Sequence, residues 1–429
     1  MFRTLANAWK IPDLRKKILY TALLLVVFRF GSIIPVPGLD KEMVKAIVDG
    51  ASDTLFGLFN TFSGGAFANA TIFAMSITPY INSSIIMQLL TVAVPALERL
   101  SKEGEEGRKK IASITRYVTV ILGFIQAAGL YAALSAQRAI TTSGFLSFIT
   151  ITFTFTAGTA FLMWLGEKIT EKGIGNGVSL IIFIGIISRG SELVNAAISS
   201  VQASNYSIMS FVTIVLVVIA AIIMIAFVIT INEGERRLPV QYAKRMQGRK
   251  MYGGQSTYIP LKVAMAGVMP IIFAMSILSF PATIANLMGA QPAANTFWGK
   301  FLALFSQTHW VYAIIYFLLV IFFTYFYTSI QFNPIEIANN MKRNGGFILG
   351  IRPGKPTSDY IQKILTRVTL IGAIALAIIA VIPVLASVFT HSNIGIGGTS
   401  VLIVVSVALE TVKQIESQML MRHYKGFLE

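Results

Sequence analysis

Long apolar segments recur along the entire chain, and they constrain its fold more than any other feature. A helix that crosses a bilayer needs about 20 mostly apolar residues. A chain that is 55% hydrophobic and 13% charged has more apolar surface than a water-soluble fold can bury. We therefore expect an all-α polytopic membrane protein with ten transmembrane helices. The ten segments, of which the fifth and tenth are short, are Ile18–Pro35, Ile72–Pro95, Tyr117–Leu134, Leu146–Leu165, Ile174–Ile187, Phe211–Ile231, Val263–Ile284, Trp310–Ile330, Val368–Phe389 and Ile396–Leu409.

One of these segments also has a β-strand pattern. Residues Phe148–Thr156 read FITITFTFT, a strict alternation that is typical of a strand. A membrane barrel would need this alternation in every segment, whereas the others are continuous apolar runs. Threonine is tolerated in membrane helices because its hydroxyl can bond to the preceding turn. We therefore predict a helix here as well.

The basic residues predict the orientation in the membrane. With the N-terminus in the cytosol, most of the 35 Lys and Arg residues fall in cytosolic loops. Because such an excess marks the cytoplasmic side, we expect a multi-pass protein of the cell membrane with both termini cytoplasmic. The net charge of +16 is then mainly a topology signal. Two of the cytosolic loops, 232–262 and 331–363, are long and basic.

Two short repeats suggest that the chain has two related halves. The string IFAMSI occurs at Ile72–Ile77 and at Ile272–Ile277, and GIG opens the fifth and tenth segments. An offset of five segments gives matching helices opposite directions, an inverted repeat that places a site between two pseudo-symmetric five-helix halves. Coincidence is an equally good explanation of such short matches. We expect divisions at 1–200 (the first five helices), 201–262 (the sixth helix and its basic loop) and 263–429 (the other helices and the tail).

Residues that usually carry chemistry are scarce. The chain has no cysteine, and no Asp or Glu lies at the middle of a segment, where ion-coupled carriers usually need one. It lacks the common metalloprotease, serine-hydrolase and phosphate-loop motifs. We expect neither an enzyme nor a cofactor or metal site, and a conduit gated by an apolar constriction fits better. Arg29, the one charge inside a segment, lines a watery cavity or, by the reading we favour, snorkels or pairs with backbone carbonyls.

The stretch Asn60–Ile81 combines two kinds of sequence. Its second half, from Ile72, reads as the start of a membrane helix. Its first half, NTFSGGAFANAT, is too polar and glycine-rich to span a bilayer, yet too apolar for an ordinary water-facing loop. By itself the pattern is explained by a surface loop or a poorly capped helix start.

Five strings together resemble the SecY family, whose members form the central subunit of the bacterial protein-translocation channel. They are TFSGGAFANATIFAMSITPYI, GIGNGVSLIIF, PVQYAKR, GIRPGKPT and GIGGTSVLIVV, and they occur in the family's order along the whole chain. The resemblance implies that Gly57–Thr71 is a plug that rests on the channel. Glycine would give this plug freedom at its bend, and its polar residues would face a water-filled funnel. The candidate plug residues are Asn60, Thr61, Phe62, Ser63, Gly64, Gly65 and Phe67.

The resemblance also implies a ring of apolar side chains at the middle of the membrane. Two helices supply pairs spaced by four residues, which places both members on one helix face. Isoleucine is bulky and stiff, so such a ring excludes water when closed and spreads around a polypeptide. Core or lipid-facing isoleucines are the ordinary alternative. The candidate ring residues are Ile77, Ile81, Ile182, Ile186, Ile272 and Ile403.

A lateral gate and two docking loops complete what the resemblance implies. Signal sequences would leave through the gate into membrane lipid, past polar contacts worth about 1 kcal/mol each. Ala264 stands where the family often has a polar residue. The candidate gate residues are Asn82, Ser83, Ser84 and Gln126. The long basic loops would dock the SecA motor and the ribosome through Arg245, Arg249, Lys250, Arg352 and Lys355, unless these charges serve topology alone.

The combined interpretation is the pore-forming subunit of a protein-conducting channel. It would pass unfolded preproteins outward, release transmembrane segments sideways, and assemble with the small membrane subunits SecE and SecG. Two other classes remain open. An inverted-repeat secondary transporter of small solutes would show a substrate-induced ion flux, and a structural scaffold would lose only stability when the ring isoleucines are replaced.

Overall fold

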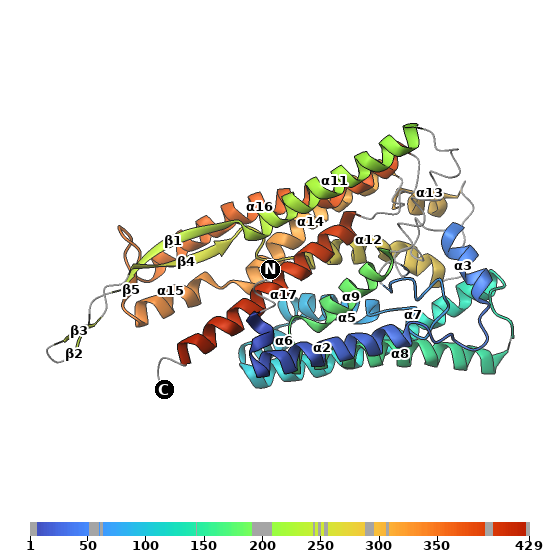
Figure 1. Cartoon of the computed structure of the whole chain (residues 1–429), viewed down its shortest axis with the longest axis horizontal. Helices are drawn as coiled ribbons and strands as arrows, with labels where there is room; N and C mark the ends of the chain where they lie inside the picture. Colours follow the sequence, from blue (N-terminus) through green and yellow to red (C-terminus); the bar gives the residue numbers. More distant parts are fainter. Residues whose placement is uncertain are drawn as a thin grey trace.

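The fold is described from a computed structural model of the chain. The structure describes residues 7–50, 60, 63–142, 144–190, 208–242, 245–247, 250–252, 256–287, 296–305, 309–390 and 398–425. Most of its helices run along the long axis of the molecule (Figure 1).

Each of the ten predicted segments coincides with a helix. In chain order these are α2 Pro12–Gly31, α5 Thr78–Ala93, α7 Glu105–Ala136, α8 Phe145–Lys172, α9 Gly177–Ser188, α11 Ile208–Glu233, α12 Met269–Leu287, α14 Trp310–Gln331, α16 Lys355–Thr390 and α17 Gly398–Lys425. Shorter helices connect them: α3 Lys41–Gly50, α6 Pro95–Lys102, α13 Phe297–Leu304 and α15 Pro334–Arg343. The prediction of an all-α polytopic fold is confirmed.

Two helices begin about two turns later than hydropathy predicts. Helix α5 starts at Thr78 instead of Ile72, and α12 starts at Met269 instead of Val263. Ser76 has a φ of 52° and Gly267 a φ of 58°, and both values interrupt a right-handed helix. The repeated string therefore differs in structure, since Ile72–Ile77 forms turns whereas Ile272–Ile277 is helical. Hydropathy detects apolar residues but not the left-handed residue that delays the helix.

The alternating segment FITITFTFT lies within α8, so the prediction of a helix is confirmed. Three of its four threonine hydroxyls donate to carbonyl oxygens four residues earlier, for example at 2.9 Å from Thr150 to Leu146 and 2.8 Å from Thr156 to Thr152. The fourth hydroxyl, that of Thr152, is buried without a hydrogen-bond partner. Most of these threonines thus satisfy their polar group inside their own helix, which makes the segment compatible with a membrane span.

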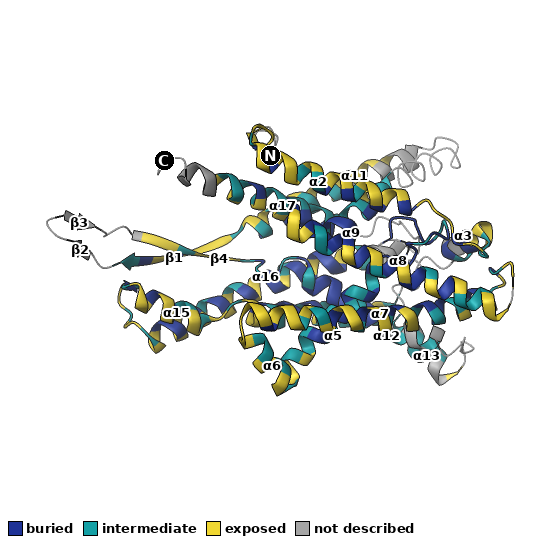
Figure 2. Ribbon diagram, turned by 90° about the horizontal axis from the view of Figure 1, so that it is seen from below, coloured by how far each residue is buried: buried dark blue, intermediate teal, exposed yellow. Residues whose placement is uncertain are grey.

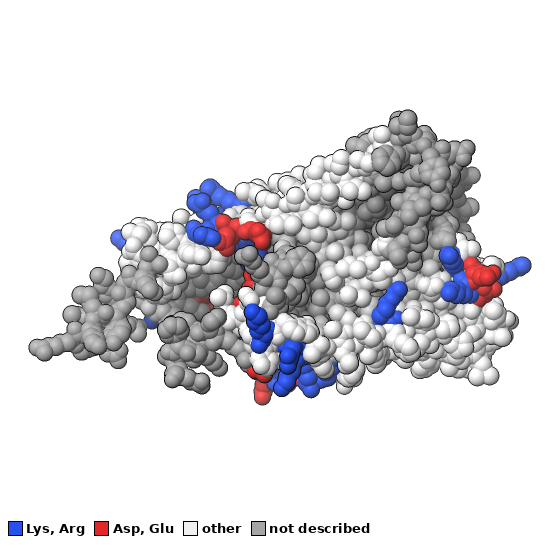
Figure 3. Space-filling model, in the orientation of Figure 1, with Lys and Arg blue, Asp and Glu red and all other residues white. Residues whose placement is uncertain are grey.

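The helices have the length and surface of membrane spans. Within the described residues, four helical stretches are long and apolar enough to cross a bilayer. Helices α5 and α6, bent by 98°, add a fifth if the pair is counted as one span. Helices α9, α11 and α12 contain shorter apolar stretches. Many large apolar side chains of the helices are exposed, such as Leu23, Phe30 and Leu318. On the face in Figure 3 the charged side chains gather in a band left of centre and in a group at the right end, and the surface between these two groups is largely uncharged. The chain is a multi-pass membrane protein.

Two groups of helices pack within the molecule and meet along two seams. Helices α2, α5, α7, α8 and α9 contact one another, and α11, α12, α14, α16 and α17 form the second group. One seam, here named the α12 seam, joins α12 to α5 and α7; the other, the α9–α17 seam, joins α9 to α17. Figure 2 shows buried residues where helices face each other and exposed residues on the outside. One large apolar cluster contains residues from both groups.

The two long basic loops form one small β-containing unit, which the sequence did not predict. Strand β1 (Glu235–Tyr242) pairs antiparallel with β4 (Ser256–Lys262) and, along its other edge, with β5 (Gly346–Phe347) from the second loop. Strands β2 (Arg245–Gln247) and β3 (Lys250–Tyr252) form a separate ladder at the far end of this arm (Figure 1). Leu238, Val240 and Met341 belong to a separate apolar core beneath the unit.

Candidate functional site

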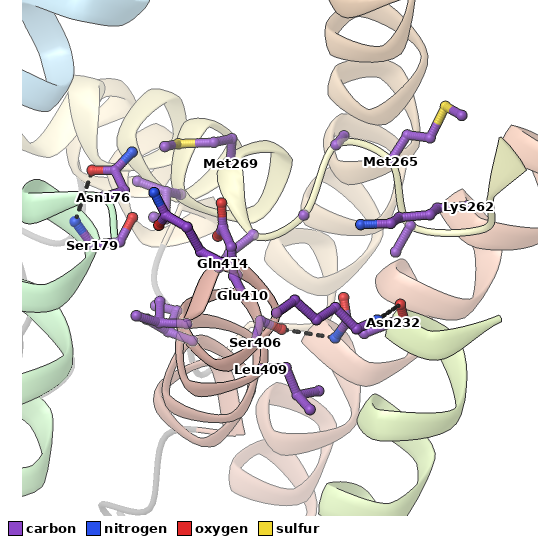
Figure 4. A pocket seen from close by; sticks show the side chains of 18 of the residues that line it. Asn176, Ser179, Asn232, Lys262, Met265, Met269, Ser406, Leu409, Glu410 and Gln414 are labelled. Carbon is purple, nitrogen blue, oxygen red and sulfur yellow. Dashed lines mark hydrogen bonds between the residues drawn. The ribbon is translucent and has the colours of Figure 1, made fainter. Parts of the chain in front are cut away.

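Two adjoining cavities open between the two groups of helices. The first has a volume of about 740 Å³ and the second about 460 Å³. Together we name them the vestibule, because they share six lining residues: Asn176, Ser179, Ile182, Met269, Ile272 and Tyr327. Figure 4 shows the second cavity, with side chains from α9, α12 and α17 around it. Its lining is about half polar, so the vestibule is suited to hold water.

Four of the six predicted ring isoleucines line the vestibule. Ile81, Ile182 and Ile272 line the first cavity, and Ile403 joins the last two in the second. Ile271, the neighbour of Ile272, lies in the same apolar cluster but lines neither cavity. The ring residues at the vestibule therefore come from α5, α9, α12 and α17.

The other two predicted ring residues line neither cavity, but they belong to or pack against the same apolar cluster. Ile77 is fully buried one turn before Ile81, and Ile186 is partly buried one turn after Ile182. The structure thus brings all six predicted isoleucines into one cluster.

Local chemistry positions α9, which carries two of these isoleucines. Asn176 caps the helix, because its side-chain oxygen accepts from the backbone amides of Val178 and Ser179. Gly177 lies against α8 so closely that a Cβ atom there would be 2.0 Å from the carbonyl oxygen of Gly166. Two residues of the GIGNG string thus have a structural role. Asn176 caps α9, and Gly177, which has no side chain, lets α8 pack closely against α9.

The described part of the predicted plug, Asn60 and residues 63–71, is a compact turn and not an extended loop. The Asn60 carbonyl accepts from the Gly65 amide at 2.9 Å, and its side-chain oxygen accepts from the Ala68 amide at 3.1 Å. Ser63 accepts from the Phe67 amide. Gly64 and Gly65 have φ values of 66° and 85°, so glycine is required at this bend. Thr61 and Phe62 lie outside the described residues.

This turn is buried, which differs from the expectation that its polar residues face water. Asn60 and Ser63 are 6% and 1% exposed. They can be buried because their side chains form hydrogen bonds with the backbone of the turn itself. Phe67 packs in a second apolar cluster with Val36 and Leu134. The end of the turn is also joined to the segment after α2, since the Val36 amide donates to the carbonyl of Ala70.

The inner side of the turn rests on α9. A Cβ atom on Gly64 would lie 2.5 Å from the Gly185 carbonyl oxygen, so the two backbones touch. Gly185 directly precedes the ring residue Ile186 in α9. The turn therefore lies against the helix that supplies two ring residues.

Comparison with known proteins identifies the family. The family model described as SecY matches residues 71–412. The protein translocase subunit SecY of Halalkalibacterium halodurans is 48% identical over 439 residues, which covers 100% of both chains. The chain belongs to the SecY family.

Solved structures show the same fold. The chain resembles a SecY channel described by its plug domain, with a TM-score of 0.67 and 19% identity over 94% of this chain and 92% of the other. It also resembles the canine Sec61 channel in a ribosome complex, with a TM-score of 0.64 and 18% identity over the same shares.

The gate residues predicted from the SecY family do not form hydrogen bonds across the α12 seam. The Ser83 hydroxyl donates to the Pro79 carbonyl of its own helix and is fully buried. Ser84 lines the vestibule, and Asn82 is half-buried. The Gln126 side-chain oxygen is buried and has no hydrogen-bond partner. Ala264 precedes α12 and lines the vestibule.

The docking residues predicted from the SecY family occupy the β-containing unit and its surroundings. Arg352 is exposed on a turn between Gly350 and Gly354, which have φ values of 79° and 109°. Its carbonyl accepts from the Thr357 hydroxyl, and Lys355 is exposed at the start of α16. Arg245 and Lys250 lie in β2 and β3, and Arg249 lies outside the described residues. Nearby, a hydrogen bond to the Glu235 carboxylate raises the pKa of Arg237.

Several polar residues of the vestibule were not predicted from the sequence. Arg116 of α7 donates to Glu167 of α8 at 2.9 Å in the first cavity. In the second cavity the Asn232 amide donates to Ser406 at 3.0 Å, and Lys413 donates to the Asn232 carbonyl at 3.3 Å. Their positions at the ends of apolar segments were the available signal. Within the described residues, no group of three His, Cys, Asp or Glu side chains is placed to hold a metal ion.

Proposed function

We propose that the chain is the pore-forming subunit of a protein-conducting channel. It passes unfolded secretory polypeptides across the plasma membrane and releases transmembrane segments into lipid. The observation that carries the proposal is the vestibule. Isoleucines from four helices line it, and the turn at residues 63–71 packs against one of these helices, α9. Membership of the SecY family supports the same function.

The isoleucine cluster acts as the closed constriction in this proposal. Apolar side chains at a narrow point expel water and so block ions without a charged barrier. The six candidates Ile77, Ile81, Ile182, Ile186, Ile272 and Ile403 form this ring. They offer a passing polypeptide no hydrogen bonds, so the ring admits many sequences. The segment 57–71 is the plug that covers the ring when no polypeptide is present.

The α12 seam is the lateral exit in this proposal. A signal sequence or membrane anchor leaves there by partitioning about 20 apolar residues into lipid. Gln126 of α7 takes part in the gate together with Asn82 and Ser84 of α5. Ser83 contributes to the gate only within α5, where its hydroxyl donates to the Pro79 carbonyl.

The polar ends of the molecule set the orientation and the partners. The termini and the β-containing unit are cytoplasmic, as the excess of basic residues in these regions indicates. This unit, with Arg245, Arg249, Lys250, Arg352 and Lys355, docks a ribosome or the SecA motor, and the small subunits SecE and SecG bind in the membrane. A likeness to ribosome-bound Sec61 supports the ribosome as a partner. The driving energy comes from such partners, and the chain itself is not an enzyme.

A disulfide crosslink tests the proposal, since the chain has no cysteine of its own. A single cysteine is placed at Ile403, and a second in a secretory chain stalled halfway across the membrane. Leu402→Cys is the matched control, because Leu402 is also buried but does not line the vestibule. We expect a disulfide at position 403, weaker at 402, and lost when the stalled chain has no signal sequence. Equal crosslinking at both positions, or a crosslink at Gln126 but none at 403, would keep the channel and contradict the proposed ring. No crosslink at any interior position would contradict the channel and favour the small-solute transporter.

A further inference from the structure

Arg29, whose role the sequence left open, belongs to a hydrogen-bonded chain that reaches the plug. Its Nη1 atom lies 3.2 Å from the hydroxyl oxygen of Ser188, the last residue of α9. That hydroxyl lies 3.3 Å from the carbonyl oxygen of Gly64 and 2.8 Å from that of Gly185. Three segments far apart in the sequence therefore meet at one hydroxyl group.

The donors and acceptors at this point are compatible. A serine hydroxyl has one hydrogen to donate and lone pairs that accept. Arginine has only donors, so Arg29 must donate to the Ser188 oxygen, and the hydroxyl hydrogen is left for a carbonyl. A charged donor polarises the hydroxyl and strengthens the bond that it donates in turn. The carbonyl of Gly64 and that of Gly185 share this hydrogen.

The shared hydrogen makes the contact reversible. When the plug leaves, Ser188 retains its bond to Gly185 within α9, so its hydroxyl is not left without a partner. Gly64 itself has no side chain that could hold it, and a Cβ atom there would lie 2.8 Å from the Ser188 oxygen. The backbone carbonyl is thus the only group of Gly64 that this contact can use.

We infer that Arg29 and Ser188 are positioning residues that hold the plug at Gly64 against α9, directly beside the ring residue Ile186. The inference rests on the proposed function, because it assigns the seat of the plug in that channel. Ser188 makes the contact, and Arg29 acts through Ser188. The charge of Arg29 inside an apolar helix thus has a specific role.

The test measures the resting ion conductance of the full channel complex in planar bilayers. Loss of one such hydrogen bond shifts the closed equilibrium about 3- to 10-fold. We therefore expect Ser188→Ala to raise the resting conductance about 3- to 10-fold, whereas Ser188→Thr, which retains the hydroxyl, stays near the wild-type value. Arg29→Gln gives a smaller rise. The double variant conducts no more than Ser188→Ala alone, because Arg29 acts through Ser188.

A plug-deleted channel separates this role from a structural one. In a channel without residues 57–71, which is itself leaky, Ser188→Ala is expected to add nothing. The inference is overturned if Ser188→Ala and Ser188→Thr conduct alike, or if the alanine variant adds conductance without the plug. It is also overturned if deletion of 57–71 leaves the conductance unchanged. The crosslink at Ile403 is independent of all these results, so failure of the seat and failure of the channel function are distinguishable.

Discussion

The two seams between the helix groups are held together differently. At the α9–α17 seam, Gly175 packs against Leu180 and lies near the hydroxyl of Thr411. On the same side, Leu14, Ile174 and Ile415 form an apolar cluster, and the Lys17 ammonium donates to Gln418. By contrast, α5 and α7, which meet α12 at the other seam, carry three buried side-chain oxygens without a hydrogen-bond partner, on Thr78, Gln88 and Gln126.

This difference indicates which seam opens. A buried polar atom without a partner costs about 1–3 kcal/mol, and less in a membrane, where an interhelical hydrogen bond averages about 0.6 kcal/mol. Opening the α12 seam would let these oxygens form hydrogen bonds with water or with a passing polypeptide. The free energy gained by these bonds would offset part of the free energy lost when the apolar contacts separate. No described residue of α9 or α17 carries such an unpartnered oxygen, so this seam has no such compensation. We therefore expect the molecule to open at α12, with the contact of α9 with α17 acting as the hinge.

Breaking the α9–α17 seam gives the largest expected effect. Gly175 has a φ of 83°, and a Cβ atom there would meet Leu180 at 3.0 Å and Thr411 at 3.3 Å. We expect Gly175→Ala to destabilise the protein by about 2–4 kcal/mol, because backbone strain adds to overpacking. Thermal unfolding of the purified complex measures the change.

A matched glycine separates strain from packing in that experiment. Gly104 has a similar φ of 78°, but nothing lies within 4 Å of its would-be Cβ atom. Gly104→Ala therefore reports strain alone, about 1–2 kcal/mol. If the two variants are equally stable, Gly175 does not support the seam and the comparison fails.

Removing the unpaired oxygen of Gln126 should strengthen the α12 seam. We expect Gln126→Leu to stabilise the closed channel by about 0.5–1.5 kcal/mol and to slow transport of chains with weakly hydrophobic signal sequences. Gln362→Leu, a change on an exposed face of α16, serves as the control and should alter stability by less than about 0.5 kcal/mol. Faster transport with the leucine variant would show that Gln126 helps to close the gate.

The smallest effect is expected from the exposed hydrogen bond on the α9–α17 side. Lys17 donates to Gln418 at 3.4 Å in an exposed position. Lys17→Met keeps the apolar stem and should cost less than about 0.5 kcal/mol, because exposed pairs contribute little. A loss above about 1 kcal/mol would mean that polar contacts, and not the apolar cluster around Ile174, hold this seam.

Local patterns predicted much of the architecture. Each of the ten apolar segments coincides with a helix, and the threonine-rich α8 was predicted correctly against its strand-like alternation. The delayed start of α5 was missed, because the left-handed backbone at Ser76 depends on packing and not on residue type. The pairing of β1 with β5 was missed for a similar reason, since the partner residues Gln241 and Phe347 lie about a hundred positions apart.

The sequence by itself determined the membrane environment, the helical segments and the membership of a family. These properties depend on hydropathy and on strings of adjacent residues, which the chain displays directly. The tertiary structure alone decided which isoleucines meet at the vestibule, and it buried the polar groups of Asn60 and Ser63 in their own turn. It also brought Arg29 to Ser188, 159 positions away, and Ser188 to Gly64. The residue type determines which bonds a side chain can form, but only the fold brings a partner within bonding distance.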